Sequence, residues 1–185
     1  MAALWAISPD GTHIAYDRAG SGPAILLLHG GGGSRLEWHQ AGYVQHLQDH
    51  FIVVTLDLRG HGESDLPTDP SAYTIEKLEQ DILAVADACG IERFALWGMS
   101  YGGKVGRYLA VHSERVQQFT MLGTPLGPGV SGQPRQDAKD FCAHWLPIIR
   151  GLSDGSLELA SLSPADQEML RTLHIPAMTG WVRAM

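Results

Sequence analysis

The sequence predicts an α/β fold, a mostly parallel sheet with helices on both faces, and three observations predict it. Apolar runs such as 24–28 and 51–56 are continuous rather than alternating, as expected of strands covered on both sides. These runs alternate with helical segments, which is typical of βαβ crossovers and a parallel sheet. A chain of 185 residues that is 44% hydrophobic and 18% charged fits an ordinary globular domain and argues against disorder or a coiled coil.

Each element has its own signal. The expected strands, in chain order, are 4–7, 12–16, 24–28, 51–56, 94–97 and 119–122. A Pro-Asp-Gly turn at 8–11 separates the first two strands and predicts an N-terminal β-hairpin. The clearest helix is 75–89, where apolar residues recur on one face after the candidate cap Thr74 and before Gly90. Further helices are expected at 101–112, 137–150 and 165–173.

The composition of the chain changes after residue 124. Residues 1–124 are expected to form the α/β core, and a stretch rich in proline and glycine follows. The two last expected helices come after it without a further buried strand. We therefore expect 125–185 to form a helical lid.

Composition excludes several classes of protein. The formal charge of −7 leaves no basic surface for nucleic acid or an anionic membrane. Two cysteines, Cys89 and Cys142, cannot make a disulfide scaffold, and no cysteine or histidine run has the spacing of metal ligands. No apolar run approaches about 18 residues, and the start of the chain does not resemble a signal peptide, so we expect a cytoplasmic location.

A G-x-S-x-G pattern at 98–102 supplies a candidate nucleophile, Ser100. The pattern alone is weak evidence, and the alternative is a serine that caps a helix. Its context is specific, because it follows the expected strand 94–97 and begins the expected helix 101–112. A serine on such a sharp turn is displayed at the edge of the sheet, and the flanking glycines prevent collisions around the turn.

A glycine run follows the strand 24–28, in the sequence His29-Gly30-Gly31-Gly32-Gly33. Backbone N–H groups at such a strand end can stabilise an oxyanion during acyl transfer. The alternatives are a flexible turn or a phosphate loop. No Gly-Lys-Ser/Thr follows, and the glycines do not match Gly-x-Gly-x-x-Gly in register, which disfavours a nucleotide site.

Three motifs together resemble the α/β-hydrolase family, in its lid-bearing, esterase- and lipase-like branch. They are His29-Gly30-Gly31, Asp57-Leu58-Arg59-Gly60-His61-Gly62-Glu63-Ser64 and Gly98-Met99-Ser100-Tyr101-Gly102-Gly103. The resemblance covers residues from about 10 to 122 and implies that Ser100 is the nucleophile. It also implies that the backbone N–H groups of Tyr101 and Gly31 form the oxyanion hole, that His29 and the loop with His61 are structural, and that no cofactor or metal takes part.

The chain departs from the family pattern in one respect. The family carries its triad acid and histidine after later strands, and no such segment is found here. His112, His144 and His174 follow no strand, so surface or lid positions are expected for them. We therefore expect the N-terminal two-thirds of a serine hydrolase, nearly inactive alone, whose strand 119–122 forms an exposed edge that favours self-association.

The resemblance implies a small-molecule ester, lactone or related acyl substrate. Serine at position 100 disfavours the relatives that use an aspartate nucleophile, the epoxide hydrolases and haloalkane dehalogenases. Trp145 and Trp181 are candidates for an apolar acyl pocket, with lid packing as the alternative. The competing class is a non-catalytic ligand-binding or scaffold protein on the same fold.

Overall fold

The computed structural model describes residues 3–123, 133–172, 174, 175, 177 and 178. They form two compact units. The sheet unit comprises 1–65 and 75–125, and the helical unit comprises 66–74 and 126–185. The segment 66–74, which the sequence places in the core, clusters with the helical unit instead.

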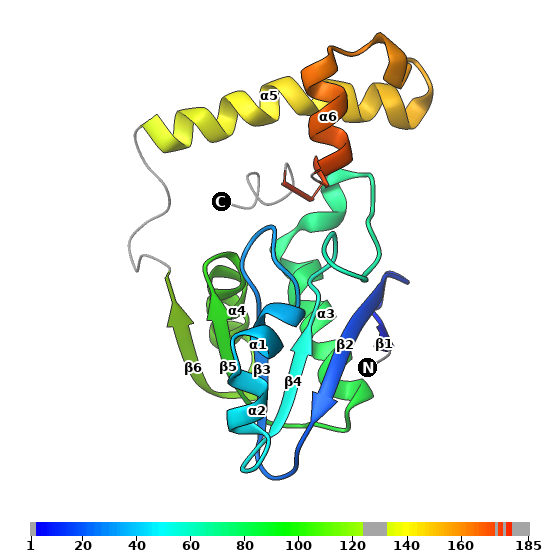
Figure 1. Cartoon of the computed structure of the whole chain (residues 1–185). Coiled ribbons are helices and arrows are strands. Elements are labelled where there is room, and N and C mark those ends of the chain that lie inside the picture. Colours follow the sequence, from blue (N-terminus) through cyan, green and yellow to red (C-terminus); the bar gives the residue numbers. More distant parts are fainter. Residues whose placement is uncertain (1–2, 124–132, 173, 176, 179–185) are drawn as a thin grey trace. The chain divides into compact units, whose positions relative to one another are not determined.

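The sheet unit holds a six-stranded sheet in the order β1-β2-β4-β3-β5-β6 (Figure 1). Its strands are β1 (Leu4–Ile7), β2 (His13–Ala19), β3 (Ala24–Leu28), β4 (Ile52–Leu56), β5 (Phe94–Met99) and β6 (Val116–Leu122). The pairs among β3, β4, β5 and β6 are parallel, and β1 and β2 add antiparallel pairs at one edge. The predicted α/β fold with a mostly parallel sheet is confirmed.

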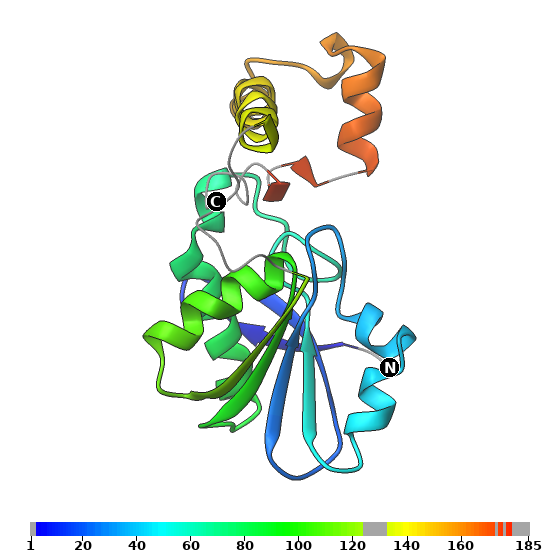
Figure 2. The ribbon, with the colours of Figure 1, turned by 90° about the vertical axis from the view of Figure 1, so that its left-hand side faces the viewer.

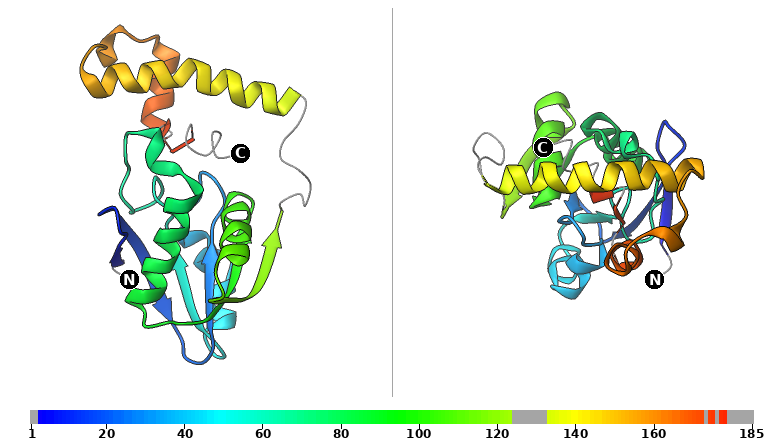
Figure 3. Two further views of the ribbon diagram at one scale, coloured as in Figure 1. Left: turned by 180° about the vertical axis from the view of Figure 1, so that it is seen from behind. Right: turned by 90° about the horizontal axis from the view of Figure 1, so that it is seen from above.

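Helices cover both faces of this sheet. They are α1 (Leu36–Gln40), α2 (Tyr43–Leu47), α3 (Ile75–Ala88) and α4 (Tyr101–His112). Figure 2 shows α1 and α2 on one face of the sheet and α3 and α4 on the other. In the rear view of Figure 3, α3 and α4 lie in front of the strands. The two faces explain the continuous apolar run of β3, because side chains of a strand alternate between faces.

β3 illustrates this double burial. Ile25 and Leu27 pack with Trp38 of α1 and Val44 of α2 in one apolar cluster. The intervening Leu26 is fully buried as well. A strand that is apolar on both faces belongs in the middle of a covered sheet.

Some elements extend beyond their sequence signals. β6 begins at Val116, whereas the apolar pattern predicted a start at residue 119. The pattern missed the first residues because Gln117 and Gln118 are exposed polar residues of an edge strand. The helices α1 and α2 have five residues each, too few to show a helical period. Within the described residues β6 forms one edge of the sheet.

The helical unit contains α5 (Gln133–Asp154), α6 (Pro164–Thr172) and the short 3₁₀ helices η1 (Pro70–Tyr73) and η2 (Leu159–Ser161). Its apolar cluster is built around Trp145, Ile149 and Ile175. The Tyr73 hydroxyl donates to Pro67 O at 2.8 Å and lies 3.0 Å from His174 Nε2, which joins η1 to the residues after α6. In the part of the chain that the structure describes, every helix is too short or too polar to cross a bilayer.

Candidate functional site

Ser100 occupies a sharp turn between β5 and α4. Its φ of 48° and ψ of −109° make it the only non-glycine residue with positive φ among the described residues. That conformation is strained for a side chain, and such strain concentrates at functional sites. The turn is fixed on both sides, since Ser100 N–H donates to Leu122 O in β6 at 2.8 Å and Ser100 O accepts from Lys104 N–H at 3.0 Å.

Steric overlap explains why the two positions that flank Ser100 are glycine. A Cβ at Gly98 would overlap the carbonyl oxygen of Gly102. A Cβ at Gly102 would lie 2.5 Å from His29 O and 2.7 Å from the Leu28 Cβ. The G-x-S-x-G pattern is therefore required for α4 to leave β5 this tightly against the end of β3.

The glycine loop after β3 lies beside the serine. A Cβ built at Gly30 would be 3.6 Å from the Ser100 Cβ, which places the two turns in contact. Within the loop, Gly33 N–H donates to Gly30 O at 3.2 Å, and Gly32 N–H donates to His61 Nε2 at 3.3 Å. Among the described residues no hydrogen bond uses the Gly31 N–H. That group is available as a donor to a ligand.

Tyr101 is the first residue of α4. The first N–H groups of a helix have no acceptor within the helix itself, and the helix dipole places partial positive charge there. The sheet unit thus brings together the three residues that the sequence singled out: the Ser100 hydroxyl, the Gly31 N–H and the start of α4.

His29 ties the glycine loop to the loop after β4. The Leu58 N–H donates to His29 Nε2 at 3.0 Å, so the imidazole is protonated at Nδ1, and Nδ1 donates to Gly30 O at 2.7 Å. The ring is fully buried, and this burial lowers the pKa of His29. Both nitrogens are used by the backbone, which leaves neither to accept a proton from Ser100.

His61, in the loop after β4, forms a second connection between that loop and the glycine loop. Its Nδ1 lies 3.2 Å from Leu58 O and 3.1 Å from Arg59 O, so Nδ1 carries the proton. Its Nε2 accepts from Gly32 N–H. Burial, with a contribution from the His29 ring 4.7 Å away, lowers the pKa of His61 to about 3. A group with such a low pKa is a weak proton acceptor at neutral pH, so His61 is unsuited to general base catalysis.

A buried ion network supports these loops. Asp57, with no exposed surface, accepts from the Arg35 N–H at 2.6 Å and from the Glu63 N–H at 2.9 Å. The Arg35 guanidinium binds Asp57, Asp17 and Glu63. Burial opposes the charge of Arg35, but its hydrogen bonds to Glu63 and Asp57 more than offset this and raise its pKa. The network anchors the end of the glycine loop where α1 begins.

The remaining predicted residues lie elsewhere. Trp145 is buried in the apolar cluster of the helical unit, and Trp181 lies outside the described residues. His112 pairs with Glu79 at 3.0 Å at the far end of α4. His144 pairs with Asp166 at 3.0 Å on the surface of the helical unit. Among the described residues, no group of three or more histidine, cysteine or acidic side chains could hold a metal ion.

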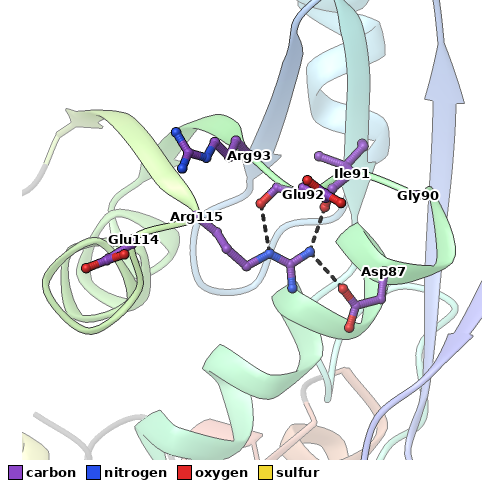
Figure 4. Close-up of a pocket in the computed structure, with 7 residues that line it drawn as sticks. All are labelled: Asp87, Gly90, Ile91, Glu92, Arg93, Glu114 and Arg115. Carbon is purple, nitrogen blue, oxygen red and sulfur yellow. Dashed lines mark hydrogen bonds and ion pairs between the residues drawn. The ribbon is translucent and has the colours of Figure 1, made fainter.

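A hollow of about 590 Å³ lies at the opposite end of the sheet, where β5 and β6 begin (Figure 4). Arg115 spans it, donating to Ile91 O at 2.6 Å and Glu92 O at 3.1 Å and pairing with Asp87 at 2.7 Å. Its remaining lining residues are Gly90, Arg93 and Glu114. The hollow is lined by charges of both signs and contains none of the residues discussed above.

Comparisons with known proteins place the chain in a family. Residues 23–145 match the sequence model described as alpha/beta hydrolase fold. Epoxide hydrolase 1 of Siraitia grosvenorii is 32% identical over 166 residues, covering 84% of this chain and 52% of that protein. The 3-oxoadipate enol-lactonase 2 of Acinetobacter baylyi is 34% identical over 103 residues, covering 55% of this chain and 37% of that protein. The chain thus spans about half or less of the length of these relatives.

Solved structures agree on the fold. The crystal structure of a hydrolase from Pseudomonas aeruginosa matches 98% of this chain and 71% of that chain, with 26% identity and a TM-score of 0.74. A structure of epoxide hydrolases from metagenomes of hot environments matches 100% of this chain and 70% of that chain, with 23% identity and a TM-score of 0.72. The family match, the sheet order and the serine turn lead to one conclusion: this chain belongs to the alpha/beta hydrolase fold family.

Proposed function

We propose that the protein hydrolyses an ester, lactone or related acyl bond, with Ser100 as the nucleophile. The observation that carries the proposal is the strained Ser100, held at positive φ beside the glycine loop. A structural helix cap gives no reason for this strain, because cap residues adopt ordinary extended angles.

The chemistry follows from the groups at the turn. The Ser100 oxygen attacks the acyl carbon, and the carbonyl oxygen becomes an oxyanion that the Gly31 and Tyr101 N–H groups stabilise. The tetrahedral intermediate collapses, the alcohol leaves with the proton taken from Ser100, and water then hydrolyses the acyl-enzyme. The proton carrier is a group other than His29 and His61, since both nitrogens of each ring are hydrogen-bonded to the backbone.

Ester chemistry fits serine better than epoxide chemistry, although several relatives are named as epoxide hydrolases. Opening of an epoxide by a serine oxygen would leave an ether on the enzyme, which has no carbonyl for water to attack. Attack on an ester or lactone leaves an acyl-enzyme, which water cleaves. The relative named as an enol-lactonase supports a lactone or ester substrate.

The proposal is tested by measuring turnover of three substrates, a small aryl ester, a lactone and an epoxide. The purified chain is compared with Ser100→Ala. Added imidazole supplies a diffusible base, since neither His29 nor His61 has a ring nitrogen that can take the proton from Ser100. We expect imidazole-dependent ester or lactone hydrolysis that Ser100→Ala loses, with an acyl-enzyme visible by intact-mass spectrometry. Without imidazole we expect little turnover, because oxyanion stabilisation alone retains only about 10³–10⁴-fold catalysis.

The competing function is ligand binding without catalysis. Saturable binding of the ester with no turnover that depends on Ser100, at any imidazole concentration, would favour it. A cytoplasmic location and self-association through the β6 edge also stay predictions. Sedimentation velocity over a range of concentrations tests the second, and a monomer at all concentrations would contradict it.

A further inference from the structure

In the middle of the glycine loop, Gly32 is held by one side chain of the loop after β4. Gly32 N–H donates to His61 Nε2, and Gly32 has a φ of 76°, so the loop turns at this residue. The adjacent Gly31 is exposed, and no described residue accepts its N–H. Without a restraint at Gly32, four consecutive glycines would sample many conformations.

The restraint works in one protonation state only. If His61 Nε2 carried a proton, its N–H would face the Gly32 N–H, and the hydrogen bond between them would break. Among the groups that act on the ring are the His29 imidazole, from the loop after β3, and, from the loop after β4, the Asp57 carboxylate and the Leu58 and Arg59 carbonyls. Burial and His29 disfavour the charged ring more strongly than these carbonyls and Asp57 favour it, so the imidazole stays neutral.

We propose that His61 is a positioning residue: protonated at Nδ1, it holds the Gly32 N–H and thereby presents the Gly31 N–H to an oxyanion formed on Ser100. The inference rests on the proposed function for its last step. His61 touches no reacting atom in this scheme. It acts through the backbone of the loop, as a preorganised support for the donor.

Two substitutions of His61 separate the role of its Nε2 acceptor from the role of its Nδ1 donor. His61→Gln places an amide oxygen near the Nε2 position, so an acceptor for Gly32 remains while the Nδ1 donor is lost. His61→Asn places its amide near Nδ1, so the donor remains while the acceptor is lost. Asn is one methylene shorter than Gln, so the two variants also differ in the space they open, and the unfolding midpoint measures that difference. His46→Gln and His46→Asn serve as surface controls, because His46 Nδ1 bonds only its own local carbonyl, Gly42 O, at 2.8 Å.

Three readouts are compared: the amide exchange rate of Gly32 by NMR, the rate of Ser100 labelling by a fluorophosphonate with imidazole present, and the urea unfolding midpoint. We expect His61→Gln to keep Gly32 protected and to label at a rate close to wild type. His61→Asn should lose the protection and label at least about tenfold more slowly at a similar midpoint. In the wild type, the His61 ¹⁵N resonances should show protonated Nδ1 and unprotonated Nε2 from pH 8 to pH 5.

Equal Gly32 exchange and equal labelling in the two variants would overturn the proposal, as would a protonated Nε2 in the folded wild type above pH 5. Labelling rates that follow the unfolding midpoint alone would reduce His61 to a stabilising residue and overturn it as well. Failure of the folded wild type to label would contradict the proposed function of Ser100. Gly32 exchange in the two variants would then still decide whether His61 holds the loop.

Discussion

The two ends of the same sheet differ in how their polar groups are arranged. At the carboxyl ends of β3, β4 and β5, buried imidazoles and guanidinium groups bind backbone and carboxylates. At the opposite end, a hollow of about 590 Å³ is lined by exposed charges (Figure 4). The comparison teaches that a hollow by itself does not identify a site, whereas buried groups that fix strained backbone do.

The two ends also differ in what their arginines do. Arg59, with no exposed surface, binds Asp81, which is equally buried, and also Asp10. Burial opposes the charge of Arg59, but its hydrogen bonds to Asp81 and Asp10 more than offset it and raise its pKa. The Arg115 side chain in the hollow is 29% exposed, and its partner Asp87 is 67% exposed. Solvent therefore screens the second pair and not the first.

The largest effect is expected from the arginines. Arg59→Met leaves Asp81 buried without its partner, so we expect the free energy of unfolding to fall by about 3–5 kcal/mol. The matched change at the other end, Arg115→Met, should cost about 1 kcal/mol or less. Urea unfolding followed by circular dichroism measures both. Similar losses in the two variants would remove the proposed difference between the ends.

Two glycines give the next comparison. In Gly98→Ala, the new Cβ meets backbone atoms of Gly102 and Gly103 that cannot move aside without shifting α4, so we expect a loss of about 3 kcal/mol. Gly90, next to the hollow, has a φ of 68° with no atom within 4 Å of a Cβ, so Gly90→Ala should cost only its backbone strain, about 1 kcal/mol. Thermal melts of the two variants rank the costs, and a higher melting temperature for Gly98→Ala would contradict the packing argument.

Acid should destabilise the end that holds the neutral imidazoles. The pKa of His61 is lowered from an ordinary 6.5 to about 3 in the folded state. Between these values the unfolded chain binds the extra proton, so stability is complete above pH 6.5 and falls as the pH decreases toward 3. At pH 5 this linkage amounts to about 2 kcal/mol.

Unfolding free energies of the wild type and His61→Gln at pH 7.5 and pH 5.0 isolate this contribution. The variant lacks the titrating ring, so its loss on acidification should be smaller by about 2 kcal/mol. His29, whose pKa is also lowered by burial, remains in both proteins. Identical losses would show that His61 titrates normally in the folded state.

Much of this molecule could be predicted from its sequence. The continuous apolar runs gave the covered strands, and the glycines around Ser100 gave the turn, because each follows from local sterics or burial. The short helices α1 and α2 and the polar part of β6 were missed, since five residues show no period and an edge strand need not be apolar.

The hydrogen bonds that organise the site could not be predicted in the same way. The contact between Gly32 and His61 joins residues 29 positions apart, and its existence depends on how two loops meet in space. The motif identified His61 as structural but gave no sign of which backbone group it holds. The pairing of Arg59 with Asp81, 22 positions apart, has no sequence signal either.

Fluorophosphonate labelling of the folded chain tests the central claim most directly, which is that Ser100 at the carboxyl end of the sheet is the nucleophile. The adduct is measured by intact mass, mapped by peptide digestion, and compared with Ser100→Ala as imidazole is increased. The account predicts one adduct, mapped to Ser100, that rises with imidazole and is absent from Ser100→Ala. An adduct on another residue, or none on a folded chain at any imidazole concentration, would contradict it.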